Sequence, residues 1–287
     1  MAVSFWRHRR RRDLPSSWAD LVAGSLGEWP HLDEHEQTRL GELIDRLLAE
    51  KGWEAARGFM LTDEMCTVIA AQAALMVLGL DIEAFREVRA IIVHPTTVVS
   101  SAPRPGPVRG VVTDAPIGLL GAAHQQRGPV VVAWDAASND AHQPGTGRNV
   151  VIHEFAHKLD MLDGLIDGTP PVPGREAYDR WVRVCTAEYQ QLRSGGRDPL
   201  LRDYGAQDPG EFFAVASEVF FDQPESMRDL KPDLYGVFVN YFRQDPAARR
   251  RVDRRACADE GSAPRWGPAG LCDAWGGDLD AGGEGCG

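Results

Sequence analysis

The segment that most constrains this chain is a pair of histidines four residues apart, His153 and His157, with Glu154 directly after the first. On an α-helix, side chains four positions apart lie above one another on the same face. Two imidazole nitrogens in that arrangement can bind one Zn²⁺, and Glu154 then lies where a carboxylate can take a proton from water. The fold is therefore expected to bring a further ligand, from elsewhere in the chain, next to this helix.

The alternative is an ordinary amphipathic helix with two solvated histidines, and the flanking sequence argues against it. Residues 130–134 are apolar, which predicts a short buried strand, and the Gly-, Pro-, Asn- and Asp-rich residues 136–149 predict a loop. The helix is expected to have Thr146 or Asn149 as its N-cap and to end near Gly164. Its apolar stripe consists of Val151, Phe155, Leu159 and Leu162. The histidines are thus expected on a helix that packs against a core.

Composition excludes several classes of protein. The chain has 287 residues, of which 43% are hydrophobic and 25% charged, as is ordinary for a globular protein. Its net charge of −11 argues against a general nucleic-acid binder, and the basic run at 7–12 is expected to be a solvated tail. No apolar stretch reaches the roughly 20 residues that a membrane-spanning helix needs, and no apolar segment follows the basic run as in a signal peptide. We therefore expect a cytoplasmic protein with neither a membrane nor a nucleic-acid partner.

The cysteines fit the same compartment, because their odd number, five, argues against a disulfide framework. Cys66 and Cys185 stand singly in helical patterns and are expected to be reduced core residues. Cys257, Cys272 and Cys286 have spacings that match no zinc ribbon. A bound metal is therefore expected to be held by histidine and carboxylate side chains.

The order of the patterns predicts an α+β fold that is mostly helical, with a small sheet beside the histidine-bearing helix. We expect a basic tail at 1–15, one domain at 16–245, and a disordered tail at 246–287, where too little apolar surface is available to offset the entropy of ordering. The predicted elements are helices at 18–50, 61–80, 178–192, 209–221 and 234–242, strands at 88–93 and 130–134, and a weaker strand at 108–113. The sheet would then span about 88–134, between a helical N-terminal part and a helical part at 146–245.

A third metal ligand is expected from a later helix. Catalytic zinc sites use three protein ligands and keep one position for water, and no histidine follows His157. Glu211 and Glu218 are the candidates; being seven residues apart, they share one helical face. Glu211 could instead be only a capping residue after Asp208, and Glu218 a surface charge or a group behind the ligands. The helix at 209–221 is heavily apolar, however, and a buried carboxylate is costly without a cation or donor, which favours a metal role for at least one of the two.

Asp160 is a candidate for a supporting role. It lies three residues after His157 and therefore on the same face of the helix. Metal-binding histidines commonly donate their second ring N–H to a carboxylate, which fixes the orientation of the ring. We expect Asp160 to provide such a carboxylate; the alternative is a polar residue that only marks the approaching end of the helix.

Three longer stretches resemble one known family. Residues 153–163 (HEFAHKLDMLD), 204–206 (YGA) and 208–224 (DPGEFFAVASEVFFDQP) are closely similar to the Mlc titration factor A family of zinc metallopeptidases, as are Phe5-Trp6 and residues 61–65. The resemblance covers about residues 5–245. It implies a zincin-like catalytic domain similar to that of anthrax lethal factor, in which a tyrosine stands seven residues before the third ligand, a glutamate.

The resemblance also implies roles for single residues. Tyr204 stands seven residues before Glu211, so Glu211 is implied as the third ligand of one Zn²⁺ per chain and Glu218 as a group behind the ligands. The implied activity is that of an aminopeptidase or endopeptidase acting on a peptide or protein substrate. Glu154 would pass the proton of the water to the leaving amine, and the Tyr204 hydroxyl would stabilise the oxyanion. The alternative for Tyr204 is a core tyrosine whose hydroxyl bonds locally.

Two further hypotheses compete with the peptidase. Enterobacterial members of the family bind the glucose repressor Mlc, so the chain could be a regulatory binding protein that sequesters an Mlc-like transcriptional repressor and uses its zinc structurally. Glu154 favours the enzyme, because a structural zinc site gains nothing from a glutamate there and usually closes with a fourth protein ligand. Nucleic-acid binding through residues 7–12 is the third hypothesis, and it predicts affinity that weakens steeply with salt.

Overall fold

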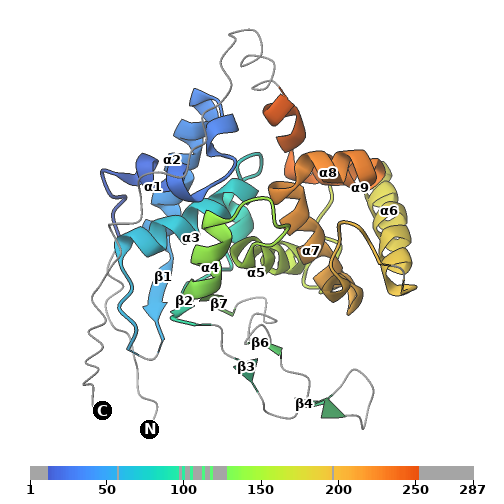
Figure 1. Ribbon diagram of the computed structural model, residues 1–287, viewed down its shortest axis with the longest axis horizontal. Coiled ribbons are helices and arrows are strands. Elements are labelled where there is room, and N and C mark those ends of the chain that lie inside the picture. The colour runs from blue at the N-terminus through green and yellow to red at the C-terminus, as the bar shows by residue number, and fades with distance from the viewer. Residues whose placement is uncertain are drawn as a thin grey trace, which may run out of the picture. The chain divides into compact units, whose positions relative to one another are not determined.

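The computed structural model describes residues 12–56, 58–96, 128–195 and 197–251, together with four two-residue strands between 99 and 118. Most of these residues are helical, and the predicted α+β class with a small sheet is confirmed. The helices are α1 (Trp18–Ser25), α2 (Glu34–Glu50), α3 (Asp63–Met76), α4 (Trp134–His142), α5 (Val150–Asp160), α6 (Arg175–Arg193), α7 (Pro209–Asp222), α8 (Pro224–Leu230) and α9 (Pro232–Phe242), with 3-10 segments η1 (Trp29–His31), η2 (Ile82–Phe85), η4 (Met161–Asp163) and η5 (Asp203–Ala206). Figure 1 shows α5 and α7 side by side in the middle of these helices.

The sheet consists of three parallel strands in the order β1-β2-β7. The strands are β1 (Gly52–Ala55), β2 (Ala90–His94) and β7 (Val130–Ala133). In β2 and β7, Ile91 pairs with Val130 and Val93 with Val132, and all four side chains are buried, as expected for β-branched residues in a covered parallel sheet. Two short antiparallel pairs, β3 (Val99–Ser100) with β6 (Ile117–Gly118) and β4 (Arg104–Pro105) with β5 (Val112–Thr113), belong to the segment between β2 and β7.

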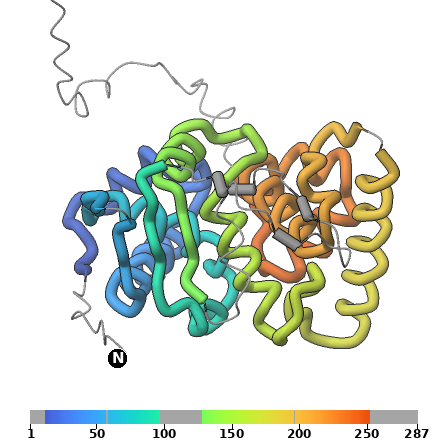
Figure 2. The backbone as a smooth tube through the Cα atoms, turned by 90° about the horizontal axis from the view of Figure 1, so that it is seen from below, coloured from blue at the N-terminus to red at the C-terminus, as the bar shows by residue number. Residues whose placement is uncertain are grey.

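Helix α5 connects the two halves of the fold. It packs against α3 and β7 of the N-terminal half and against α7 of the C-terminal half. Figure 2 shows the N-terminal half with its sheet on one side of this helix and the helices that follow residue 175 on the other. Side chains that point from α5 toward α7 are therefore enclosed between two halves of one core, which includes Val151, Phe155, Phe212 and Val215.

Several predicted elements were wrong in detail. Residues 136–149 are not all loop, because α4 follows β7 without a gap and only residues 143–149 connect α4 to α5. Alanine is the strongest helix former, and Ala137 and Ala141 bury one face of α4. The helix predicted at 18–50 is divided into α1, η1 and α2, because Pro30 starts a new segment and Asp33 forms a capping box with Glu36 at the start of α2. Strand β1 was missed, since Gly52 is its only buried residue and the segment has no alternating apolar pattern.

The helical structure continues past the C-terminal boundary predicted at 245. Residues 246–251 are helical, Ala247 is fully buried, and one compact unit extends to Arg250. Arg249 forms an ion pair with Glu36 at 2.6 Å and Arg250 one with Glu28 at 2.5 Å. These ion pairs hold residues 246–251 against the N-terminal helices, and the composition of the segment does not reveal them. The remainder of the predicted tails, residues 1–11 and 252–287, lies outside the described residues.

The cysteines agree with expectation where the structure describes them. Cys66 and Cys185 are buried free thiols, and burial raises the pKa of the Cys66 thiol to about 12. Cys257, Cys272 and Cys286 lie outside the described residues. Among the helices that the structure describes, none combines the length and the apolar character needed to cross a bilayer.

An aromatic cluster fixes α7 against α6 and α9. Trp181 of α6 stacks on Phe238 of α9, with ring centroids 5.1 Å apart. Phe213 of α7 packs edge-on against Trp181 at 5.7 Å and lies 5.8 Å from Phe238. All three side chains are almost completely buried. The position of α7 relative to α5 therefore depends on how well these rings fill the space behind it.

We expect Phe213→Ala to lower the free energy of unfolding by about 3 to 5 kcal/mol, because it removes a ring from the centre of this cluster and leaves a cavity. Urea unfolding followed by circular dichroism measures the change. The matched control is Leu230→Ala on α8, where the side chain is exposed and the expected change is below about 0.5 kcal/mol. Equal effects of the two substitutions would contradict the assignment of Phe213 to the core.

Candidate metal centre

Helix α5 presents the two histidines to the interior. Its N-cap is Asn149, whose side chain accepts a hydrogen bond from the backbone N–H of Ile152 at 2.9 Å. The helix ends in η4, after which Gly164 adopts a left-handed conformation with φ 93°. Every residue from 151 to 160 is buried. Because α5 has no solvent face in this stretch, His153 and His157 lie in the protein interior rather than in solvent.

His153, His157 and Glu211 converge at one point. Their ligand atoms all lie within 4.8 Å of one another, and all three residues are buried. Nε2 of His153 lies 3.0 Å from Oε2 of Glu211, Nε2 of His157 lies 3.6 Å from the same oxygen, and the two Nε2 atoms are 3.3 Å apart. Two imidazoles and a carboxylate that face one another in this way form a group of donors that could hold a single metal ion.

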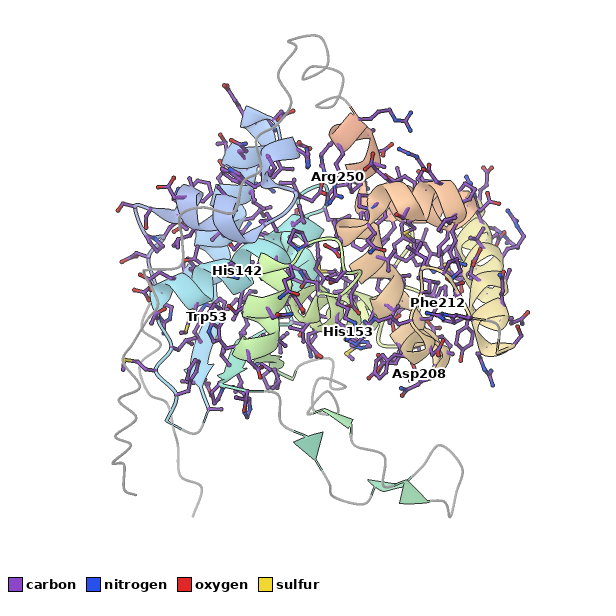
Figure 3. The ribbon with its side chains drawn as sticks, viewed as in Figure 1. Trp53, His142, His153, Asp208, Phe212 and Arg250 are labelled. Atoms are coloured by element: carbon purple, nitrogen blue, oxygen red, sulfur yellow. The ribbon has the colours of Figure 1, made fainter. Side chains whose placement is uncertain are left out.

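Glu211 reaches this point because of the way α7 begins. Asp208 is the N-cap and accepts a hydrogen bond from the backbone N–H of Glu211, and Pro209 occupies the first turn. The capping interaction predicted from the sequence is therefore present, but it uses the Glu211 backbone, while the Glu211 side chain faces the histidines. Asp208, at the start of α7, and His153, on α5, are labelled in Figure 3. The structure brings Glu211, and not Glu218, into the convergent group of His153 and His157.

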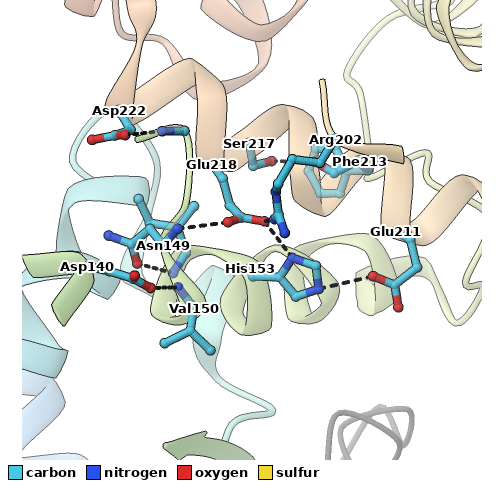
Figure 4. A network of polar contacts seen from close by, with 12 residues as sticks. Asp140, Asn149, Val150, His153, Arg202, Glu211, Phe213, Ser217, Glu218 and Asp222 are labelled. Carbon is cyan, nitrogen blue, oxygen red and sulfur yellow. Dashed lines mark hydrogen bonds and ion pairs between the residues drawn. The ribbon is translucent and has the colours of Figure 1, made fainter. Parts of the chain in front are cut away.

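Glu218 lies on the other side of the His153 ring. Its Oε1 is 2.8 Å from Nδ1 of His153, and its Oε2 accepts a hydrogen bond from the backbone N–H of Asn149 at 2.7 Å. Arg202 donates to the same Oε1. Figure 4 shows His153 between the two carboxylates, with Nδ1 toward Glu218 and Nε2 toward Glu211. A proton on Nδ1 that is donated to Glu218 leaves the lone pair of Nε2 available for a metal.

These contacts shift the pKa values of the protein groups. Burial on its own would lower the pKa of His153, but the hydrogen bonds with Glu211 and Glu218 outweigh it and raise that pKa to about 10. Burial would raise the pKa of Glu211, whereas its contacts with His153 and His157 hold it well below the usual value. A metal ion at this point would take the place of the proton that these groups share.

Glu154 is the most enclosed carboxylate of the site. Its side chain has no solvent exposure, and burial raises its pKa to about 8, although the neighbouring His153 acts in the opposite direction. Neither carboxylate oxygen has a hydrogen-bond partner among the residues that the structure describes. A buried carboxylate without donors is costly, so it marks a position that is suited to receiving a proton.

Tyr204 lies over the same group from η5. Its ring centroid is 5.8 Å from that of His153. Burial raises the pKa of its hydroxyl, and the nearby carboxylates of Glu211 and Glu154 raise it further. The hydroxyl is thus a neutral donor beside Glu211. A Cβ on Gly205 would come within 3.3 Å of Val215 on α7, so the close approach of η5 to α7 places Tyr204 there.

Asp160 contacts a loop rather than an imidazole. Its Oδ2 accepts a hydrogen bond from the backbone N–H of Gly168 at 3.1 Å, and the side chain is fully buried. Gly168 has φ 74°, and a Cβ there would clash with the carbonyl oxygen of Pro209. Asp160 thereby holds the loop after η4 against the first turn of α7. This differs from the expected role as a partner of a ring N–H: the side chain supports the helix that carries Glu211.

Two charged neighbours of the site, Arg202 and Lys158, are not marked by any motif or spacing in the sequence. Lys158 follows Glu154 by four residues, is buried, and donates to the carbonyl oxygen of Gly128 at 3.2 Å; burial lowers its pKa to about 8, against the opposing effect of Glu154. Arg202 pairs with Glu218. A buried Glu218 requires a cation or several donors, so the sequence does predict a positively charged partner for it. Residue spacing alone does not identify Arg202 as that partner.

Comparison with known sequences decides the family. The sequence model of the family described as glucose-regulated metallo-peptidase M90 matches residues 3–243. The chain belongs to this family. It is 33% identical over 250 residues to Mlc titration factor A of Serratia proteamaculans (85% of this chain and 93% of the relative) and 32% identical over 246 residues to an uncharacterized protein of Synechocystis (84% and 89%). Mlc titration factor A of Pectobacterium atrosepticum is 32% identical over 223 residues (76% and 83%).

Membership in this family agrees with the resemblance noted in the sequence. The family description supports a metallopeptidase-type domain, and the group formed by His153, His157 and Glu211 could hold a metal ion. The match extends over α1 to α9 and so includes every element that contributes to the site.

We expect Asp160→Asn to stabilise the metal-free protein at neutral pH. Burial raises the pKa of Asp160 from 3.8 to about 7. Between these two pH values the carboxyl group is protonated in the folded state and ionised in the unfolded state. The wild type therefore loses stability relative to the variant as pH rises from about 4 to about 7, and the difference is then constant, at about 2 to 4 kcal/mol. Urea unfolding in the presence of a chelator at pH 5, 6, 7 and 8 measures it. An Asp179→Asn control on the exposed face of α6 should show no such trend; a difference that does not grow with pH would refute the prediction.

Proposed function

We propose that this chain is a zinc-dependent peptidase in which His153, His157 and Glu211 hold one Zn²⁺. Two imidazole nitrogens and a carboxylate oxygen form a common donor set of catalytic zinc sites. A tetrahedral site with bonds of about 2.0–2.1 Å has donor atoms about 3.3 Å apart, and the three donor pairs here are separated by 3.0, 3.3 and 3.6 Å. The residues present therefore fit zinc in chemistry and in spacing.

Glu154 carries the proposal for a catalytic rather than a structural site. Bound Zn²⁺ supplies a Lewis acid that lowers the pKa of water and polarises a carbonyl. The Glu154 carboxylate, which is buried and has no donor among the described residues, accepts the proton of the attacking water and then delivers it to the leaving amine. A structural site would have no use for this carboxylate.

Tyr204, Glu218 and Asp160 are proposed to assist in different ways. The neutral Tyr204 hydroxyl lies beside the ligands and donates a hydrogen bond to the oxyanion that forms at the scissile carbonyl. Glu218 accepts the Nδ1 proton of His153 and so fixes the ring with Nε2 toward Glu211. Asp160 fixes the loop that abuts α7. With these roles, the proposed substrate is a peptide or protein. Assays with peptide substrates whose N-terminus is free or blocked separate aminopeptidase from endopeptidase activity.

A regulatory role is the second proposal, and it is compatible with the first. Relatives that match more than three quarters of the chain are named Mlc titration factor A, and we propose that this chain also binds a transcriptional repressor in the cytoplasm. The reduced state of Cys66 and Cys185 is consistent with that compartment. Size-exclusion chromatography of the chain with a purified Mlc-like repressor tests it. A complex that also forms with Glu154→Gln would show that binding does not need catalysis. The absence of a complex would contradict the regulatory proposal and would not affect the peptidase proposal.

We expect Glu154→Gln to abolish peptide hydrolysis while the metal stays bound. The amide cannot accept the proton of water, which lowers kcat by about 10²- to 10⁴-fold, whereas His153, His157 and Glu211 are unchanged. Metal analysis of the purified variant and a peptide-substrate screen measure the two effects. Glu176→Gln, on the exposed face of α6, is the matched control and should behave as the wild type. Hydrolysis by the variant at the wild-type rate would refute the enzymatic proposal.

Tyr204→Phe is expected to lower kcat by about 10- to 10³-fold with little change in KM, because the hydroxyl is proposed to bind the oxyanion and not the ground-state peptide. The zinc content should not change, since Tyr204 is not among the ligands. Steady-state kinetics with one peptide substrate, with Tyr178→Phe on α6 as an exposed control, provides the comparison. A rise in KM at constant kcat would instead assign Tyr204 to substrate binding.

A further inference from the structure

Glu218 is the meeting point of three donors from two segments. It accepts from the backbone N–H of Asn149, from Nδ1 of His153 and from the guanidinium of Arg202. Asn149 and His153 belong to the first turns of α5, whereas Arg202 directly precedes η5. Figure 4 shows the Glu218 carboxylate between Asn149 and His153, with the Arg202 guanidinium beside it. This carboxylate therefore connects the metal centre with a segment that contributes no ligand.

The burial of Glu218 requires a positive charge. Its side chain is only 2% exposed and stands on the apolar helix α7, where an ionised carboxylate without a counter-charge is strongly destabilising. Arg202 supplies that charge from a side chain that is 29% exposed. The Arg202 side chain is therefore partly exposed, while its guanidinium contacts a carboxylate that lies directly behind His153.

Arg202 also fixes the segment that carries Tyr204. It precedes Tyr204 by two residues, and the backbone N–H of Gly205 donates to the carbonyl oxygen of Arg202 at 3.0 Å. At its other end η5 is held where Gly205 packs closely against Phe212 and Val215 of α7. The ion pair with Glu218 and this packing together attach η5 to α7 on both sides of Tyr204.

We propose that Arg202 is a positioning residue of the metal centre: through Glu218 it holds the His153 ring in its metal-binding orientation, and through the same ion pair it anchors η5, which carries Tyr204. The inference rests on the proposed function for the role of Tyr204, but its effect on metal binding does not. An exclusively structural Arg202 would stabilise the fold without a specific effect on the affinity for zinc.

The test compares Arg202→Met with Arg202→Lys. Loss of a group that orients a ligand typically lowers metal affinity by about 10- to 100-fold, and this is the loss expected for Arg202→Met, measured by competition with a chromophoric zinc chelator. Arg202→Lys keeps a positive charge that can contact Oε1 of Glu218 and is expected to retain affinity within about threefold of wild type. In peptide hydrolysis, Arg202→Met is expected to lower kcat with KM nearly unchanged. Should Arg202→Met fail to fold, Arg202→Gln takes its place, because it removes the charge and keeps an N–H donor.

A second buried ion pair provides the matched control. Arg250 is 19% exposed and pairs with Glu28, which is 2% exposed, so its burial resembles that of the Arg202–Glu218 pair. Figure 3 shows Arg250 well away from His153. Arg250→Met is expected to lower stability in urea and to leave zinc affinity within about twofold of wild type. If Arg202→Met and Arg250→Met lower zinc affinity equally, Arg202 has only a structural role and the inference is overturned.

A double-mutant cycle tests whether Arg202 acts through Glu218. In a Glu218→Gln background, Arg202→Met is expected to change zinc affinity by less than about twofold, because the carboxylate that transmits its effect is gone. A folded Arg202→Met variant with wild-type zinc affinity, or an equal loss in both backgrounds, overturns the inference. A wild-type protein that binds zinc and hydrolyses no peptide contradicts the proposed function instead, and the affinity measurements still decide the role of Arg202.

Discussion

The structure depends on the mutual compensation of charged groups that α5 and α7 enclose between them. His153, Glu154, His157, Glu211 and Glu218 are all nearly inaccessible to solvent. Each of these groups would be costly in the interior on its own. Glu211 faces two imidazoles and Glu218 faces one imidazole and a guanidinium, whereas Glu154 has no such partner among the described residues. The compensated groups hold the centre together, and the Glu154 carboxylate, without such a partner, is the group to which we assign the proton transfer of the proposed reaction.

Apolar packing determines where these groups can meet. The aromatic rings of α6, α7 and α9 fix α7 from behind, and the sheet and α3 support α5 from the other side. The two helices are thereby held at one separation, and the imidazole and carboxylate atoms stay within 4.8 Å of one another. This rigid surrounding would hold the three side chains of the proposed metal site in position before a metal ion binds.

Much of the fold and the central helix could be predicted from the sequence, because their signals are local. Asn149 as the N-cap, Gly164 at the helix end and the β-branched strands each follow from short-range physical chemistry. Spacing could not decide whether Glu211 or Glu218 joins the two histidines, since both lie on one face of α7. Only the three-dimensional structure shows that Glu211 faces both histidines, whereas Glu218 lies behind the ring of His153. Arg202 and the partner of Asp160 depend on loops, whose course no periodicity encodes. Ligand assignment in this chain is therefore a question of tertiary contact rather than of motif.

The segment at 246–251 has a consequence for how the chain is made. Arg250 reaches back to Glu28, which burial would otherwise disfavour as a charged group, and Arg249 reaches Glu36 at the start of α2. The first helices therefore acquire their counter-charges from the last described residues. During synthesis on the ribosome, Glu28 and Glu36 cannot form these ion pairs until residues 249 and 250 have emerged from the exit tunnel, so the packing of the first helices is completed late.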